Sequence, residues 1–219
     1  FSEKFMTCEL SPLCHDITIM PSLEAVCDRL LGHPGWVPKV LWGGVLSFIP
    51  VLNLFALGYL LEYVVRLHQS REWHLPVWKE MEPIPLFVGG GQVFILLLAY
   101  AGAPILAGWI ISHLLDLLTF GMLGIASYLP LAAGSFIAPF LFIASMLAFV
   151  RYGLYSDAWK VVLILKFAQV MAPKLVLPVI AFWGTVLLGL PVYGLSFFLG
   201  IWVLLAYASA LNFSKINQD

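Results

Sequence analysis

The chain has few charged residues. Asp, Glu, Lys and Arg make up 11% of its 219 residues, whereas 62% are hydrophobic. The mean hydropathy of +0.97 lies well above what a soluble domain needs to fill a core. The net charge of −1 gives no reason to expect a nucleic-acid partner or a strongly basic membrane anchor. We therefore expect an integral membrane protein with several spans of about 20 residues each and no large soluble domain.

Sequence patterns that carry catalysis or bind metals are missing as well. The chain has no HExxH or CxxC motif, no paired carboxylates and no Ser/His/Asp or Cys/His set, so we expect no enzyme and no metal site. The three cysteines, Cys8, Cys14 and Cys27, match no common metal pattern. The simplest interpretation is free thiols, and a Cys8–Cys14 disulfide is the alternative.

The positions of the basic residues predict a topology. The 11 basic residues fall into clusters separated by nearly chargeless stretches, and cytoplasmic loops are rich in Lys and Arg. We expect an all-α polytopic membrane bundle of about four to five transmembrane helices, with a re-entrant or kinked first segment, interfacial amphipathic helices and both termini cytoplasmic. The expected divisions are a cytoplasmic segment 1–38, the re-entrant or kinked segment 39–67, an interfacial loop 68–85, helices 86–111 and 130–151, an interfacial segment 152–174, helices 175–189 and 194–212, and a tail 214–219; residues 39–213 form one transmembrane domain.

Two of these divisions have alternatives. Segment 39–67 would be about 43 Å long as one helix and could cross once with a tilt. The form that we prefer is a re-entrant hairpin broken at Pro50 to Asn53, with Asn53 capping the second of two arms that are too short to cross. Between the helices 86–111 and 130–151 we expect an outer connection, and the alternative is a further span through 106–128.

A short stretch before these spans has helical spacing. In residues 21–31, PSLEAVCDRLL, the apolar side chains fall on one face. The stretch is too short to span, so the pattern predicts a helix on the membrane surface. The alternative is a helix packed against the protein's own loops.

Three motifs carry a family resemblance. They are HPGWVPKVLWGGVLSFIPVLNLFALGY at 33–59, LPVW at 75–78 and FVRYGLYSDAW at 149–159. In this order they resemble a family of prokaryotic multi-pass membrane proteins catalogued only as a domain of unknown function. The resemblance covers most of the chain after Pro21. It implies a surface helix, a Gly-Gly segment, a basic loop and further spans, and it leaves the function open because the family has no established activity. We accordingly expect a prokaryotic inner, or thylakoid-type, membrane.

Polar side chains within or near the apolar runs are the candidate site residues. His113 and Asp116, spaced i and i+3, are expected to form a solvated or capping pair, and a transport or proton-linked role is the alternative. Glu62 and Arg66, spaced i and i+4, suit an ion pair at the end of a helix. The other candidates either line a solute path or join helices by hydrogen bonds; they are Asn53, Gln92 and Tyr100.

We expect bound lipid and no cofactor. A haem held by two histidines would need a second histidine at membrane depth, and the others fall in the segments that we place in the cytoplasm. A single histidine can ligate a pigment such as chlorophyll, so His113 stays open as a ligand. Four tryptophans are expected to anchor the chain at the membrane interface; they are Trp36, Trp73, Trp78 and Trp159.

These observations favour a non-catalytic accessory, assembly or scaffold subunit that packs against other membrane-protein subunits. The reasons are the few polar groups within the apolar runs and the many small and aromatic residues. The alternative is a small-solute permease or channel, suggested by the broken first segment and by Asn53, Gln92 and His113. We expect the lipid bilayer as a partner and no nucleic acid.

Overall fold

The structure, a computed structural model, describes residues 22–153 and 155–216. Within these ranges the chain is helical and contains no strand. In the part of the chain that the structure describes, five helical stretches are long and apolar enough to cross a membrane; they are Pro50–Ser70, Pro83–Leu118, Gly124–Arg151, Val161–Leu188 and Leu190–Phe213. The predicted all-α polytopic fold with about four to five spanning helices is confirmed.

The first helix, α1 (Leu23–Leu31), begins where the hydroxyl of Ser22 accepts a hydrogen bond from the backbone N–H of Ala25 at 3.1 Å. Val26 and Leu30 on its apolar face are buried, and α1 packs against α8 (Tyr193–Ile216). The predicted helix is therefore present. We considered a helix on the membrane surface and a helix packed against the protein itself. The burial of the apolar face of α1 against α8 favours the second placement.

Segment 39–67 is broken, but earlier than predicted. Helix α2 (Trp36–Ser47) ends before Phe48, and α3 (Pro50–Ser70) starts with Pro50 at its first position. Proline suits that position because the first N–H groups of a helix have no intrahelical partner. Asn53 consequently lies inside α3, so the prediction that it caps this helix is wrong. The second arm has 21 residues, so it is long enough to cross a membrane and not too short.

The next helix is longer than the predicted range 86–111. α4 (Pro83–Leu97) continues through a π-helical turn, η3 (Leu98–Gly102), into α5 (Ala103–Leu118). The wide turn absorbs Pro104 at the start of α5 without ending the helix. A 3₁₀ turn, η4 (Gly124–Tyr128), then leads into α6 (Leu129–Tyr152). The connection is therefore shorter than expected, and the alternative of a separate span through 106–128 is wrong.

The predicted interfacial segment 152–174 is helical over most of its length. After a 3₁₀ turn, η5 (Tyr155–Trp159), α7 runs from Val161 to Leu188 and includes Lys166 and Lys174. Lysine need not end an apolar helix, because its long stem can lie along the helix while the ammonium group reaches a polar surface. The predicted turn before α8 is present as η6 (Leu190–Val192).

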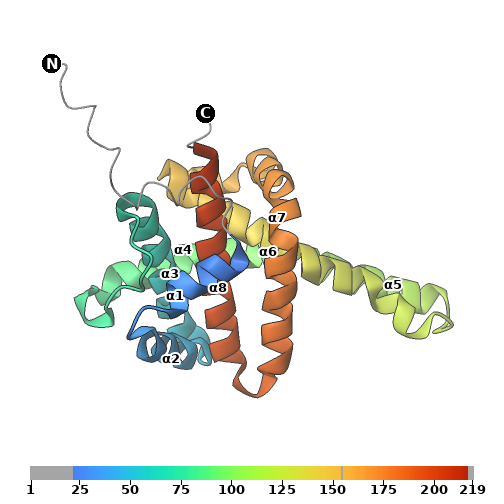
Figure 1. Cartoon of the computed structure of the whole chain (residues 1–219). Coiled ribbons are helices and arrows are strands. Elements are labelled where there is room, and N and C mark those ends of the chain that lie inside the picture. Colours follow the sequence, from blue (N-terminus) through green and yellow to red (C-terminus); the bar gives the residue numbers. More distant parts are fainter. Residues whose placement is uncertain (1–21, 154, 217–219) are drawn as a thin grey trace.

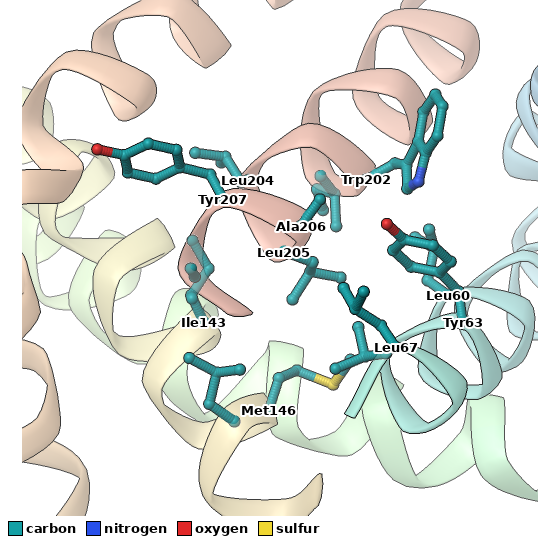
Figure 2. Packing of buried hydrophobic residues seen from close by; sticks show 14 of the residues in the cluster. Leu60, Tyr63, Leu67, Ile143, Met146, Trp202, Leu204, Leu205, Ala206 and Tyr207 are labelled. Carbon is teal, nitrogen blue, oxygen red and sulfur yellow. The ribbon is translucent and has the colours of Figure 1, made fainter. Parts of the chain in front are cut away.

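Helix α8 lies at the centre of the core. From Ile201 to Phe213 every residue except Val203 is buried. Figure 2 shows the two sides of this helix: Trp202 and Leu205 lie toward Tyr63 of α3, whereas Leu204 and Tyr207 lie on the other side. Helices α1, α2, α3, α6 and α7 all contact α8.

The α5–η4–α6 hairpin extends away from this core. In Figure 1 it extends to the right, whereas α7 and α8 run from top to bottom, and its tip lies far from the other helices. We call residues 103–137, which comprise α5, the turn and the first turns of α6, the α5–α6 arm. Gly108 of α5 faces Pro130 and Leu131 of α6, and Gly134 faces Pro104, so the two helices of the arm approach closely through glycine.

The packing of α3 on α4 gives a first prediction. A Cβ atom at Gly90 would collide with the backbone carbonyl of Leu54, whereas one at Gly91 would meet nothing within 4 Å. Alanine favours a helix by about 1 kcal/mol over glycine at either position, but overpacking costs about 1–3 kcal/mol and falls only on Gly90. We expect Gly90→Ala to lower the melting temperature of the purified protein in detergent and Gly91→Ala to leave it unchanged or raise it. Equal melting temperatures for the two variants would contradict this packing.

Candidate functional site

The loop that joins α3 to α4, residues 71–82, lies back along α3. Arg71 ends α3 with a left-handed backbone, φ 58°, which turns the chain round. The Tyr63 hydroxyl then donates to the carbonyl of Trp73 at 3.2 Å, and the Tyr59 hydroxyl donates to that of Pro76 at 2.7 Å. The two tyrosines are four residues apart, so one face of α3 holds the loop at two successive points.

The start of α2 holds the same loop from the other side. The Lys39 ammonium donates to the carbonyl of Leu75 at 2.5 Å, and the Trp78 indole N–H donates to the carbonyl of Lys39 at 3.2 Å. The Trp78 ring also stacks on Tyr59 with ring centroids 3.9 Å apart and an angle of 6° between the ring planes. Residues near both ends of segment 39–67 therefore meet on one loop.

Helix α1 and the turn after it also contact the loop. The Arg29 guanidinium lies 5.1 Å from the centre of the Trp73 ring, and the His33 and His74 rings are 5.2 Å apart. We call the contacts of Lys39, Tyr59 and Tyr63 with loop 71–82, including those of Trp78 within the loop, the loop lock.

The four tryptophans predicted as interfacial anchors differ in their surroundings. Trp36, Trp73 and Trp78 pack on the protein, and the ring of Trp36 lies 6.4 Å from that of Trp202. Trp159 is more exposed and lies 6.3 Å from the Tyr100 ring.

A cavity of about 250 Å³ lies between α3 and α4, beside the loop. Its charged lining consists of Glu62, Arg66, Glu80 and Glu82, and Gly58 and Gly89 form part of its apolar wall. The predicted ion pair is present, with Arg66 Nε 2.9 Å from Glu62 Oε1. Three carboxylates and one guanidinium thus line the cavity, and this excess of negative charge suits an ammonium group better than an anion. Among the described residues, no three His, Cys, Asp or Glu side chains are placed to hold a metal ion.

The other polar residues predicted within the apolar runs are not brought together. Tyr100, in the π-helical turn, donates to the carbonyl of Ala158 at 2.7 Å. The backbone carbonyl of Gln92 accepts from the Tyr155 hydroxyl at 3.4 Å. The side-chain oxygen of Asn53 is buried and has no hydrogen-bond partner in the described part of the chain. Tyr100 and Gln92 therefore join α4 and its π-helical turn to η5, and do not form a shared polar surface with Asn53.

His113 and Asp116 lie on the α5–α6 arm. His113 is exposed, and its ring meets the Trp109 ring edge-on at a centroid distance of 4.4 Å. Asp116 is partly buried, and no hydrogen bond joins it to His113 among the described residues. Their roles as a capping pair, relay or ligand remain predictions.

Sequence reasoning missed the loop lock and the acidic side of the cavity. The signal for the lock was the spacing of Tyr59 and Tyr63 on the α3 face that precedes the Leu-Pro-x-Trp loop. For the cavity the signal was Glu80 and Glu82, two acids just before an apolar run. Neither pattern predicts which face of α3 the loop packs against.

The loop lock gives a second prediction. Tyr59→Phe removes the donor to the buried carbonyl of Pro76, and the loss of one such bond costs about 1 kcal/mol. We expect a lower free energy of unfolding in mixed detergent micelles and faster tryptic cleavage after Lys79. Tyr193→Phe is the matched control, because that hydroxyl is exposed and its bond to the carbonyl of Phe48 is 3.3 Å long. Cleavage after Lys79 at the same rate in both variants would show that the hydroxyl of Tyr59 does not hold the loop.

Comparison of the chain with known protein families, with curated proteins and with solved structures finds no match. The geometry and chemistry described above therefore carry the functional argument.

Proposed function

We propose that this protein is a non-catalytic membrane scaffold or accessory subunit whose α5–α6 arm packs against another membrane protein. The exposure of the arm carries the proposal. At its tip Phe120 is 92% exposed, Met122 89% and Ile125 90%. Within the most apolar part of the helix Pro83–Leu118, only 17% of the residues are buried in the protein. The corresponding share is 78% for the stretch Leu190–Phe213, which contains most of α8.

The length of this helix favours a protein partner over lipid alone. At 1.5 Å per residue its 36 residues extend about 54 Å, whereas the hydrocarbon layer is about 30 Å thick. Even at a tilt of about 40°, the upper end of the observed range, the helix would exceed that layer by roughly 10 Å. The apolar tip would then need a protein surface to cover it.

The polar groups of the arm support the same proposal. His113 and Asp116 lie on a helix that has no other residue of a charged type, and an ionisable group facing hydrocarbon is costly. A partner that supplies polar contacts would remove this cost. The permease alternative has less support, because Tyr100 is used in a helix contact and only Asn53 among the proposed path residues has an unpartnered buried oxygen.

The membrane and the topology also belong to this proposal. We infer a prokaryotic inner or thylakoid-type membrane from the resemblance to the multi-pass family. Arg66, Arg71 and Arg151 lie near the ends of α3 and α6, and we assign these ends to the cytoplasmic side by the positive-inside rule. The bond of Lys39 to loop 71–82 supports a segment 39–67 whose two ends return to the same side.

Site-specific photocrosslinking in the native membrane tests the scaffold. A photoreactive phenylalanine analogue at Leu117, on the arm and 71% exposed, is compared with the same group at Leu177, on α7 and 66% exposed. We expect a discrete crosslinked protein at position 117 and only lipid adducts at position 177. Lipid adducts alone at both positions would contradict the scaffold.

A measurement of solute flux tests the permease alternative. Protein reconstituted alone into vesicles is expected to show no solute flux above that of empty vesicles. A flux that Asn53→Leu abolishes would favour the permease, whether or not a partner is found.

A further inference from the structure

The C-terminal parts of α3, α6 and α8 bring a second group of polar side chains together around Phe213. The Arg71 guanidinium carbon lies 3.5 Å from the centre of the Phe213 ring, and the His68 ring is 5.0 Å from the same ring. Arg151 Nη1 donates to Asn212 Oδ1 at 3.4 Å. We call His68, Arg71, Arg151 and Asn212 the basic cluster.

Two members of this cluster have buried polar atoms without a partner. The Asn212 residue is only 6% exposed, and its Nδ2 donor has no hydrogen-bond partner in the described ranges. His68 Nε2 is also buried and unpartnered there, and so is the hydroxyl of Ser209, one turn before Asn212 on α8. A buried polar group normally finds a partner because its desolvation is otherwise uncompensated. The unused donor of Asn212, next to a guanidinium, points to a missing acceptor.

The charge of the cluster defines what that acceptor should be. Arg71 and Arg151 both interact electrostatically with His68. Partial burial lowers the pKa of the Arg71 guanidinium, but the group stays charged at neutral pH because an arginine side chain is not deprotonated in proteins. The carboxylates of Glu62, Glu72 and Glu80 interact electrostatically with Arg66, which is not a member of the basic cluster. Two guanidinium groups and an amide donor suit an anion with several oxygens.

We propose that the basic cluster binds a phosphate group carried by the headgroup of an anionic membrane lipid. Arg71 and Arg151 supply charge and hydrogen bonds, and Asn212 Nδ2 supplies a further donor. A lipid is favoured as the source because the cluster lies near the ends of apolar helices, and basic pockets between membrane helices bind such headgroups. Stabilisation of helix C-termini by the two arginines explains their charge, but it leaves the Nδ2 donor of Asn212 and the hydroxyl of Ser209 without a partner in the described ranges.

The test is lipid binding by the full chain in neutral detergent, measured by native mass spectrometry. We expect phosphatidylglycerol to bind more tightly than phosphatidylcholine. Arg71→Gln and Arg151→Gln should each weaken phosphatidylglycerol binding about fivefold, whereas Lys79→Gln, which changes an exposed lysine of loop 71–82, should not. Inorganic phosphate should compete only weakly.

Asn212→Asp separates binding from folding. The aspartate has nearly the same shape and offers a carboxylate to Arg151, so the melting temperature should stay the same or rise. The added negative charge should weaken phosphatidylglycerol binding by about tenfold or more through repulsion of the phosphate. Equal affinity for the two lipids, or unchanged affinity in Asn212→Asp and both arginine variants, would overturn the proposal. Competition by inorganic phosphate as strong as that of the lipid would assign the site to a free anion and overturn the lipid source.

Discussion

The burial of α8 from Ile201 to Phe213 is the constraint on which the rest of the described structure depends. An apolar helix without an exposed face needs neighbours in every direction, and α1, α2, α3, α6 and α7 supply them. Helix α2 approaches through Gly43 and Gly44, where added Cβ atoms would collide with Phe198 and Leu195 of α8. Because lipid is as apolar as leucine, such close packing, rather than transfer out of water, stabilises helix contacts in a membrane.

The helices that do not pack closely against α8 are the ones whose surfaces are available to other partners. α4 packs mainly on α3, and α5 packs mainly on α6. Neither has a main contact with α8, so large parts of both stay exposed. The loop lock compensates at one end, since Tyr59 and Trp78 fix the loop from which α4 begins. At the other end, within the described residues, α5 is held mainly by α6 and the turn before it, and the arm is exposed there.

The apolar runs of the sequence predicted the fold class, and local spacing predicted α1 and the ion pair of Glu62 with Arg66. The errors came from treating single residues as helix ends. Lys166 and Lys174 lie within α7, because lysine is a good helix former and its stem can lie along an apolar helix. Asn53 lies within α3, because packing along the helix outweighs the weak preference of one residue. The bonds of Tyr59 and Lys39 to the loop join residues 17 and 36 positions apart. Such contacts depend on the path of the loop in three dimensions, which spacing along the chain does not specify.

Helix α6 connects the two surfaces that we propose to be functional. Its first turns belong to the α5–α6 arm, and Arg151 near its end belongs to the basic cluster. Between them, the stretch from Ala138 to Ala148 is buried at every position except Leu141, and Phe142 and Ile143 belong to the core that contains α8. Well-packed interiors resist small displacements. A partner that moved the base of the arm would therefore have to disturb this packing, so the partner and the lipid should bind to one rigid frame.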